Sequence, residues 1–277
     1  MQTEPGDAGA AYLHGANSTE QARLLRRTAA NSAAFLLPHL QPGWELLDCG
    51  CGVGSITCDF ANVIAPGRAV GLDMQGAQIE RARRLAVERG ARNVKFDIGS
   101  VYDLSYADGR FDAVFANTLF QHLKEPERAL AEIRRVLKPG GVVAVADDDH
   151  STVLWEPRTP ALTEALRLIA RVIAHTGGDV YRARHHRRLL LEAGFVRVSA
   201  TGTLGTGGVW GSPEETRLFA AWFADQLRAP AGRELMIGQG WTDADSLEAI
   251  IGDVLAWGER PDAFFAVLGV AATGWVD

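Results

Sequence analysis

Residues 46–55 read Leu46-Leu47-Asp48-Cys49-Gly50-Cys51-Gly52-Val53-Gly54-Ser55, an apolar run that ends at an acid and is followed by alternating glycines. Glycine at every second position lets the backbone approach a ligand where any side chain would collide. The N–H groups that open the next helix face the same point. The stretch therefore predicts a nucleotide-type site at the carboxyl end of a first parallel strand.

The spacing of these glycines separates two kinds of nucleotide site. A dinucleotide-binding loop has the pattern G-x-G-x-x-G/A, which would need glycine or alanine at position 55. Position 55 is serine here, and the pattern is Asp48-x-Gly50-x-Gly52-x-Gly54. A nicotinamide-dependent oxidoreductase is therefore the less favoured interpretation, and the motifs further along the chain have to decide.

Strands and helices alternate from residue 44 to about residue 150. We expect strands over 45–49, 69–73, 94–98, 111–116 and 142–146, and helices over 55–64, 78–88 and from Pro126 to Pro139-Gly140-Gly141. Such an alternation predicts a parallel sheet with helices on both faces.

The two ends of the chain depart from this alternation. Ser18-Thr19-Glu20-Gln21 reads as a capping box, which predicts one helix that continues to Pro38. Towards the other end we expect helices over 160–173 and 180–193, a strand over 194–198, a mostly helical stretch over 203–262 and a last strand over 263–275. The stretch over 203–262 is far longer than a tight connection between two strands requires. It therefore predicts an insertion that could serve as a lid.

These elements together predict an α/β fold with a Rossmann-like, seven-stranded and mostly parallel sheet. Helices cover both faces, a helical flap precedes the sheet, and a helical insertion precedes the last strand. The expected divisions are a tail and helical flap over 1–43, a ligand-binding core over 44–204, a helical lid over 205–262 and the last core strand over 263–277.

The composition excludes several classes of protein. Hydrophobic residues make up 47% of the chain and charged residues 22%, as in ordinary globular proteins. A net charge of −6 argues against a nucleic-acid partner, which requires a basic face. No apolar run approaches the roughly 20 residues of a membrane span. Residues 1–11 lack the zones of a secretory signal, so we expect a cytoplasmic protein.

Two clusters of side chains receive structural interpretations. The three cysteines, Cys49, Cys51 and Cys58, lie at or just after the glycine loop and are expected to be buried, reduced thiols. A basic cluster is expected to be a solvated helix face; it comprises Arg182, Arg184, His185, His186, Arg187 and Arg188.

Four further segments line up with the glycine loop. In chain order they are Asp73-Met74, Gly99-Ser100-Val101, the run from Phe111 through Asn117 to Gln121-His122-Leu123, and Leu137-Lys138-Pro139-Gly140-Gly141. In this order the set resembles the motif series of class I S-adenosylmethionine-dependent methyltransferases. It is most similar to the small-molecule branch that includes the quinone-biosynthesis methyltransferases, which shares a Tyr-x-x-Gly segment like Tyr12 to Gly15.

The resemblance implies S-adenosylmethionine as cofactor and a set of residues that bind it. These residues are Asp48, Gly50, Cys51, Gly52, Gly54, Asp73, Met74, Gly99, Ser100, Val101, Asn117, Gln121 and His122. The glycine loop would hold the methionine part, Asp73 the ribose, and Asn117 the amino-acid end. Met74, Ser100 and Val101 would surround the adenine. Many relatives have an acid where this chain has Ser100, so Asp97 or Asp103 could substitute for it.

Catalytic candidates follow from the chemistry of methyl transfer. A base is needed only if the acceptor arrives protonated. Asp149 and His150 follow the fifth strand at the ligand edge of the sheet, and Tyr12 and His14 lie on the flap. His150 is the favoured base, with a structural role as its alternative. A divalent ion on Asp147, Asp149 and His150 is less favoured, because neighbouring strand residues point to opposite faces; we expect no metal.

The resulting functional hypothesis is methyl transfer to a small, apolar or aromatic acceptor. Five aromatic residues of the insertion suit an apolar substrate wall, although packing of a helical subdomain explains them equally well; they are Trp210, Phe219, Trp222, Phe223 and Trp257. A cyclase or rearrangement enzyme on the same scaffold and a non-catalytic cofactor-binding protein are the alternatives. A homodimer through the insertion also stays open.

Overall fold

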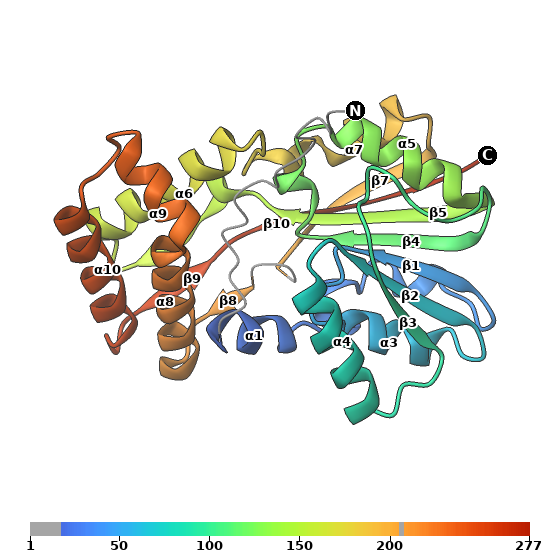
Figure 1. The fold of residues 1–277 in the computed structure, drawn as a ribbon, viewed down its shortest axis with the longest axis horizontal. Coiled ribbons are helices and arrows are strands. Elements are labelled where there is room, and N and C mark those ends of the chain that lie inside the picture. Colours follow the sequence, from blue (N-terminus) through green and yellow to red (C-terminus); the bar gives the residue numbers. More distant parts are fainter. Residues whose placement is uncertain (1–17, 205–207) are drawn as a thin grey trace, which may run out of the picture. The chain divides into compact units, whose positions relative to one another are not determined.

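The computed structural model describes residues 18–204 and 208–277, which form two compact units (Figure 1). The sheet unit contains residues 24–153, 181–208 and 267–277. The helical unit contains residues 18–23 together with 154–180 and 209–266. No helix within the described ranges has both the length and the apolar character needed to cross a membrane.

A seven-stranded sheet forms the centre of the sheet unit, as predicted. Its strands are β1 (Glu45–Cys49), β2 (Arg68–Asp73), β3 (Val94–Ile98), β4 (Phe111–Asn117), β5 (Leu137–Asp148), β7 (Val196–Thr203) and β10 (Gly269–Trp275). They lie in the order β3-β2-β1-β4-β5-β10-β7. Strands β3, β2, β1, β4 and β5 are parallel, whereas β10 runs antiparallel to both of its neighbours.

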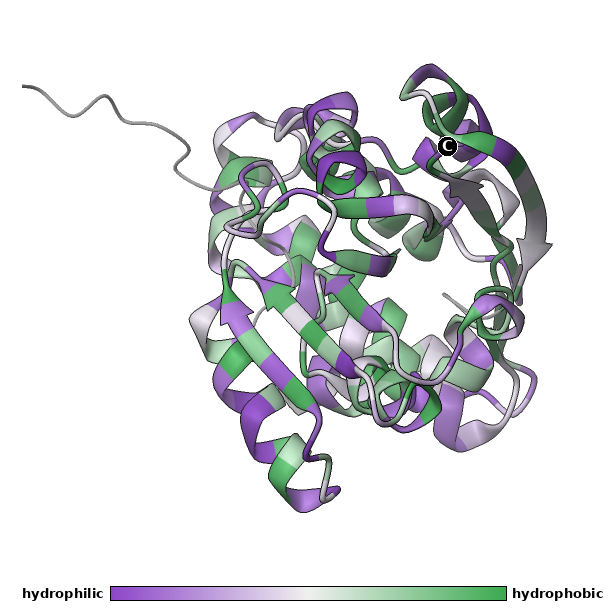
Figure 2. Cartoon of the chain, turned by 90° about the vertical axis from the view of Figure 1, so that its right-hand side faces the viewer, coloured by the Kyte–Doolittle hydropathy of each residue, from purple (hydrophilic) through white to green (hydrophobic). Residues whose placement is uncertain are grey.

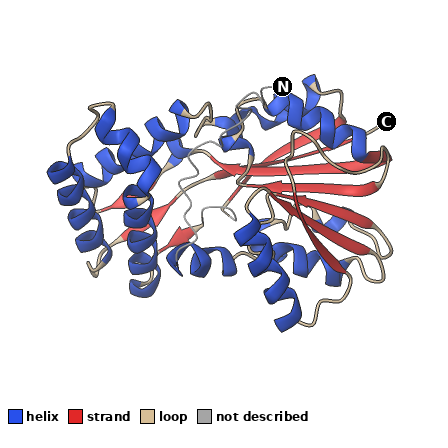
Figure 3. Ribbon diagram, in the orientation of Figure 1, coloured by secondary structure: helices blue, strands red, loops and turns tan. Residues whose placement is uncertain are grey.

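Helices cover both faces of this sheet (Figure 3). They are α2 (Ala29–Ser32), α3 (Ser55–Val63), α4 (Gly76–Glu88), α5 (Pro126–Val136) and α7 (His186–Glu192). Successive strand residues point to opposite faces, so Leu47 packs in the core under α5 and α7 while Leu46 packs with Phe60 of α3. The helix ribbons carry hydrophilic and hydrophobic segments side by side, as expected for helices with one buried face (Figure 2).

The helical unit has its own small core. It comprises the greater part of α1 (Ser18–Leu25) together with β6 (Leu154–Glu156), α6 (Pro160–His175), β8 (Val209–Trp210), α8 (Pro213–Arg228), α9 (Pro230–Gly238), α10 (Ala244–Gly258) and β9 (Phe264–Ala266). Strands β6, β9 and β8 form an antiparallel sheet. Phe219 stacks on Phe265 with ring centroids 4.0 Å apart, and Trp210, Phe223 and Trp257 surround it.

The buried state of these aromatic residues decides between the two interpretations of the insertion. Trp210, Phe219, Phe223 and Trp257 are each at most 7% exposed. Trp222 donates a hydrogen bond to the buried carboxylate of Glu20 and carries the guanidinium of Arg23 over its ring at 4.5 Å. The aromatic side chains therefore form the interior of the helical unit rather than an open wall.

Several expectations about single elements are corrected. The helix expected up to Pro38 ends at Leu25 and restarts as α2, because Thr28 accepts a hydrogen bond from the Asn31 N–H and donates its own N–H to the Asn31 side chain. The helix expected up to residues 139–141 ends at Val136, since the residue before a proline avoids the helical conformation.

The remaining corrections concern the second half of the chain. Residues 180–193 form a 3₁₀ turn, η4 (Arg182–His185), followed by α7. The single strand expected over 263–275 divides into β9 of the small sheet and β10 of the large one. Helix α6, expected in the core, packs with α8, α9 and α10 of the helical unit.

Candidate functional site

The glycine loop connects β1 to α3 in a backbone conformation that favours glycine. Gly50, Gly52 and Gly54 have φ angles of 73°, 53° and 75°. A Cβ atom on Gly54 would lie 2.6 Å from Cζ of Phe96 and 2.9 Å from Cβ of Ala82. Position 54 therefore requires glycine both for its backbone angle and for its lack of space. The N–H groups of the first turn of α3 follow directly from it.

Asp73 ends β2 and fastens the centre of the glycine loop. Its Oδ2 accepts a hydrogen bond from the Gly52 N–H at 3.0 Å, and its Oδ1 accepts one from the Gln75 N–H at 2.9 Å. Burial raises the pKa of this carboxyl, and the two N–H groups oppose that rise. A carboxylate has about four lone-pair directions, so each oxygen can still accept from a ligand hydroxyl.

Asp48 lies beneath the loop instead of facing outward. Its side chain is buried, and its Oδ2 accepts a hydrogen bond of 2.5 Å from the Thr57 hydroxyl of α3. Burial raises the pKa of Asp48 to about 7; the Thr57 hydrogen bond lowers it and the nearby Asp73 raises it further. The carboxyl thus ties β1 to α3 and titrates near neutral pH.

This raised pKa predicts a pH-dependent effect of Asp48→Asn on stability. Between its ordinary pKa near 4 and about 7, the folded state holds a proton that the unfolded state has lost, so the wild-type free energy of unfolding falls as pH rises. The asparagine variant lacks this loss, which amounts to roughly 4 kcal/mol at most. Urea titrations should show that the free energy of unfolding of the variant, relative to that of the wild type, increases from about pH 5 to pH 8. An equal difference at both pH values would contradict the assignment.

The ends of β2 and β3 present two exposed apolar side chains. Met74 and Ile98 are each 60% exposed, and Ile98 pairs with Asp73 in the sheet. Met74 is thus not a core residue, which agrees with its predicted role beside the adenine. Ile98 was not among the residues predicted from the sequence, although its position at the end of the third strand, beside Asp73, was a usable signal.

Gly99, Ser100 and Val101, the three predicted residues after β3, have different surroundings. A Cβ on Gly99 would lie 2.8 Å from Cδ1 of Leu72, so the two strands approach closely there. Ser100 Oγ accepts a hydrogen bond from the Tyr102 N–H at 3.2 Å, and Val101 is buried in the core under α5.

The two acids considered as substitutes for Ser100 lie in different surroundings. Asp97 Oδ2 accepts hydrogen bonds from Lys95 and from the Tyr106 hydroxyl, at 3.0 and 3.1 Å. Asp103 is exposed. The Asp97 carboxylate is therefore already hydrogen-bonded to Lys95 and Tyr106, and Asp103 is the more accessible of the two acids.

The segment of residues 117–122 at the end of β4, here called the exit segment, holds buried polar groups that have no hydrogen-bond partner among the described residues. Asn117 is 7% exposed, and within the described ranges neither its Oδ1 nor its Nδ2 has a hydrogen-bond partner. The same holds for Oε1 of Gln121, whose Nε2 lies 3.3 Å from Nε2 of His122. A Cβ on Gly50 would lie 3.2 Å from Cδ1 of Leu119, so the exit segment packs on the glycine loop.

These observations fit a polar ligand with an amino-acid end. Buried amide groups are almost always hydrogen-bonded, and those left over point to a partner that the protein chain does not supply. Because β1, β2, β3 and β4 are parallel, the glycine loop, Asp73, Met74 and Asn117 all lie at the same edge of the sheet.

The residues after β5 do not support both catalytic candidates equally. Asp149 accepts hydrogen bonds from Arg184 at 2.6 and 2.8 Å and from the Ser151 N–H and hydroxyl at 3.0 and 2.8 Å. Burial raises the pKa of Asp149, but the Arg184 and Ser151 bonds outweigh it and the pKa lies below its usual range. So low a pKa makes this carboxylate a weak base at neutral pH.

Of the other catalytic candidates, the structure describes only His150. His150 is half-buried and opens the turn η3 (His150–Thr152) directly after β5. Tyr12 and His14 lie outside the described residues. Within the described ranges, no three metal-ligating side chains are grouped to hold an ion.

The expectation of a fully solvated basic cluster is wrong for one member. His186 is 1% exposed, and its Nε2 lies 3.0 Å from Oδ2 of the equally buried Asp147. Arg184, Arg187 and Arg188 are exposed. The cluster is therefore mixed, because α7 turns its first residue into the core.

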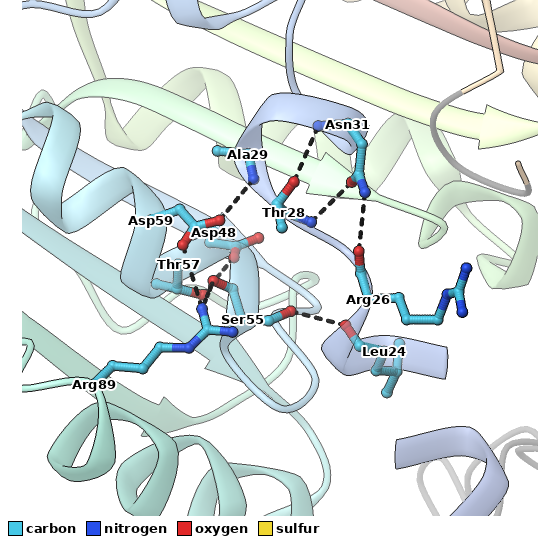
Figure 4. A network of polar contacts seen from close by, with 10 residues as sticks. All are labelled: Leu24, Arg26, Thr28, Ala29, Asn31, Asp48, Ser55, Thr57, Asp59 and Arg89. Atoms are coloured by element: carbon cyan, nitrogen blue, oxygen red, sulfur yellow. Dashed lines mark hydrogen bonds and ion pairs between the residues drawn. The ribbon is translucent and has the colours of Figure 1, made fainter. Parts of the chain in front are cut away.

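Hydrogen bonds hold the segment before β1 against the start of α3 (Figure 4). Ser55 donates its hydroxyl to the Leu24 carbonyl at 3.0 Å, and Asp59 accepts from the Ala29 N–H at 2.9 Å. Arg89 donates to the Ser55 carbonyl at 3.0 Å and to Asp59 at 3.3 Å. This part of the expected flap is fastened beside the glycine loop.

The cysteines are free thiols of unequal burial. Cys49 and Cys58 are buried, whereas Cys51 in the glycine loop is half-buried. Burial raises the pKa of the Cys58 thiol to about 11 and that of Cys51 well above its usual range. All three are therefore protonated at neutral pH and are poor nucleophiles or metal ligands.

A separate cavity of about 400 Å³ lies over the β7 and β10 side of the sheet. Arg197, Thr273 and Trp275 are among its lining residues, with Phe35 and His39. None of the residues predicted to bind cofactor or to act in catalysis lines it.

Comparison with known proteins adds an independent observation. The family model of a methyltransferase domain matches residues 40–188. The chain is 28% identical to the probable methyltransferase ltbC of Aspergillus luteorubrus over 288 residues, 95% of this chain and 96% of that protein. It is 34% identical to a demethylmenaquinone methyltransferase of Symbiobacterium thermophilum over 105 residues, 37% of this chain and 42% of that protein. Among solved structures, the [4+2]-cyclase SpnF is similar, with a TM-score of 0.52, 25% identity and coverage of 94% of this chain and 82% of that one.

Proposed function

Since this chain belongs to the family of class I S-adenosylmethionine-dependent methyltransferases, we propose that it transfers a methyl group to a small-molecule acceptor. The observation that supports a working site most directly is the glycine cradle together with the buried amide of Asn117 and the Oε1 atom of Gln121, which have no hydrogen-bond partner among the described residues. A vestigial fold would not need to retain polar groups whose burial without a partner costs free energy.

In this proposal, different residues of the chain bind different parts of the cofactor. The glycine loop and the first N–H groups of α3 bind the methionine part, and Asn117 and Gln121 bind its amino and carboxylate groups. Asp73 accepts hydrogen bonds from the ribose hydroxyls, and Met74 and Ile98 lie against the adenine. When bound, S-adenosylmethionine supplies an electrophilic methyl group on a sulfonium that leaves as a neutral thioether.

The protein's main contribution to the rate is then alignment. Holding an acceptor atom in line with the methyl carbon and the sulfur can lower the barrier by roughly 7–11 kcal/mol. Only an acceptor that carries a proton needs a base as well. His150, directly after β5, is the proposed base; Asp149 serves it indirectly by capping the same turn and binding Arg184.

His150→Ala is therefore expected to lower turnover while leaving cofactor binding intact. Loss of a general base should reduce kcat by on the order of 10²–10⁴-fold, with the Kd for S-adenosylhomocysteine unchanged. His39→Ala is a matched control, since it removes an exposed histidine of the same unit that lies outside the proposed site. Wild-type kinetics in the His150 variant would remove this residue from the mechanism.

A second candidate function retains the cofactor and changes the reaction. The similarity to the cyclase SpnF extends over 94% of this chain at 25% identity, so a cyclisation or rearrangement on the same scaffold is the alternative. The two functions differ in their products: a methyltransferase releases S-adenosylhomocysteine and a product heavier by one methylene, whereas a cyclase yields an isomer of its substrate.

The test begins with calorimetry of the purified protein with S-adenosylmethionine and S-adenosylhomocysteine. A panel of phenols, catechols, quinols and aromatic amines is then incubated with a labelled methyl donor and examined by mass spectrometry. Label transfer with equimolar S-adenosylhomocysteine supports the proposal. Isomerised product favours the cyclase, and binding without any product favours a non-catalytic role. Absence of heat with both compounds, together with tight NADH binding, overturns the proposal.

A further inference from the structure

A histidine and an aspartate are buried together beneath the exit segment. The side chains of His186 and Asp147 are each 1% exposed, and Nε2 of His186 lies 3.0 Å from Oδ2 of Asp147. Asp147 lies near the end of β5, and His186 is the first residue of α7. Two apolar residues could fill this space at a lower cost of desolvation, so packing alone does not account for the pair.

Both members of the pair face the exit segment. The ring of Phe120 meets the ring of His186 edge to face, with centroids 5.9 Å apart. Burial raises the pKa of Asp147, and the neighbouring ring of His186 opposes that rise. One residue earlier, the Ala146 carbonyl accepts a hydrogen bond from the Thr118 N–H at 2.7 Å. The end of β5 therefore supports the exit segment along its length.

The exit segment has a conformation that needs such support. Thr118 has a φ of 56°, a region that a threonine adopts only at a cost in free energy. Asn117 precedes Thr118, and Leu119 and Gln121 follow it. Polar atoms of Asn117 and Gln121 are proposed to bind the cofactor, and Leu119 packs on Gly50. A shift of this segment would displace all of these contacts at once.

We propose that His186 acts through Asp147 as a positioning residue, and that the pair holds the exit segment in the geometry that binds the cofactor's amino-acid end. This inference rests on the proposed function. The His186 ring contacts both the Asp147 carboxylate and the Phe120 ring, so it links the end of β5 to the exit segment. Neither side chain touches the cofactor.

The test compares variants of the pair with a packing control on the same helix. His186→Leu removes the ring nitrogen, His186→Gln retains a donor, and Asp147→Asn alters the acceptor. Leu190→Ala, fully buried on α7 in the same core, is the control. For each variant we measure the Kd for S-adenosylhomocysteine by calorimetry, KM for S-adenosylmethionine, kcat and Tm.

The expected pattern separates positioning from packing. His186→Leu should weaken S-adenosylhomocysteine about tenfold or more, because it leaves the buried carboxylate without its partner. His186→Gln should recover most of that affinity. His186→Leu combined with Asp147→Asn should be little worse than either alone. Leu190→Ala should lower Tm and leave the Kd unchanged.

Three outcomes overturn the inference: a wild-type Kd in His186→Leu, an equal loss of affinity in Leu190→Ala, or failure of glutamine to recover binding. If the His186 variants do not fold, Asp147→Asn decides, and an unchanged Kd in it overturns the inference. Failure of the wild-type protein to bind S-adenosylhomocysteine would instead refute the proposed function.

Discussion

Replacing Gly54 by alanine should abolish cofactor binding and destabilise the protein by about 3 kcal/mol or more. The new methyl group would lie 2.6 Å from the ring of Phe96 and 2.9 Å from Ala82, and the backbone would keep a φ of 75° that alanine disfavours. Since β3 and α4 hold these neighbours, the loop has to move, and its N–H groups then leave the ligand. Urea unfolding and calorimetry with S-adenosylhomocysteine measure the two effects.

Gly140→Ala is a control for the backbone angle alone. Gly140 has a φ of 78°, close to that of Gly54, but a Cβ there would meet nothing within 4 Å. This variant should lose only about 1 kcal/mol and bind S-adenosylhomocysteine like the wild type. If Gly54→Ala is as stable as Gly140→Ala and binds S-adenosylhomocysteine equally well, the close approach of the glycine loop to Phe96 does not shape the binding site.

Replacing Asp73 by asparagine should weaken binding of S-adenosylhomocysteine on the order of 10²-fold. Both carboxylate oxygens accept from backbone N–H groups, those of Gly52 and Gln75. Asparagine has one oxygen and one NH₂ group, so one of these N–H groups would face another donor. Either the Gly52 or the Gln75 N–H would lose its acceptor, and the ribose hydroxyls would lose a charged acceptor. Calorimetry measures the affinity and a thermal melt measures the fold.

Asp112→Asn provides the matched control for this substitution. Asp112 also accepts from a backbone N–H, that of Glu45 at 2.8 Å, and pairs with Lys138, but it lies at the opposite end of β4 from Asn117. Its asparagine variant should alter stability and leave the Kd unchanged. Equal affinities in the Asp73 variant and the wild type would remove Asp73 from the cofactor site.

Patterns of a few neighbouring residues were enough to predict the sheet and the edge at which its ligand is expected to bind. The predicted bounds of β1 and β3 coincide with the observed ones, and those of β2 and β4 differ by one residue. Apolar runs bounded by glycine and proline determine such strands through contacts within a few residues. The glycine spacing and the acid after β2 also specify a ligand loop locally, because backbone angle and strand end are near-neighbour properties.

The same kind of reasoning could not assign partners across the chain. Arg184 and Asp149 are 35 residues apart, and nothing near either residue indicates that Asp149 is engaged instead of available as a base. His186 appeared to belong to a solvated basic face, and its burial depends on how α7 packs against β5. The pairing of β6, β8 and β9, which draws residues from three separate stretches, is equally invisible to a local pattern.

The sequence by itself thus determined the doubly covered parallel sheet, the family and the glycine loop with Asp73, since each depends on residue order over short distances. Tertiary structure alone decided which titratable groups are free, paired or buried, and that the tryptophans and phenylalanines of the insertion form a core. The reason is physical: burial and charge pairing depend on which surfaces meet after the chain has folded, and those surfaces come from segments that are distant in sequence.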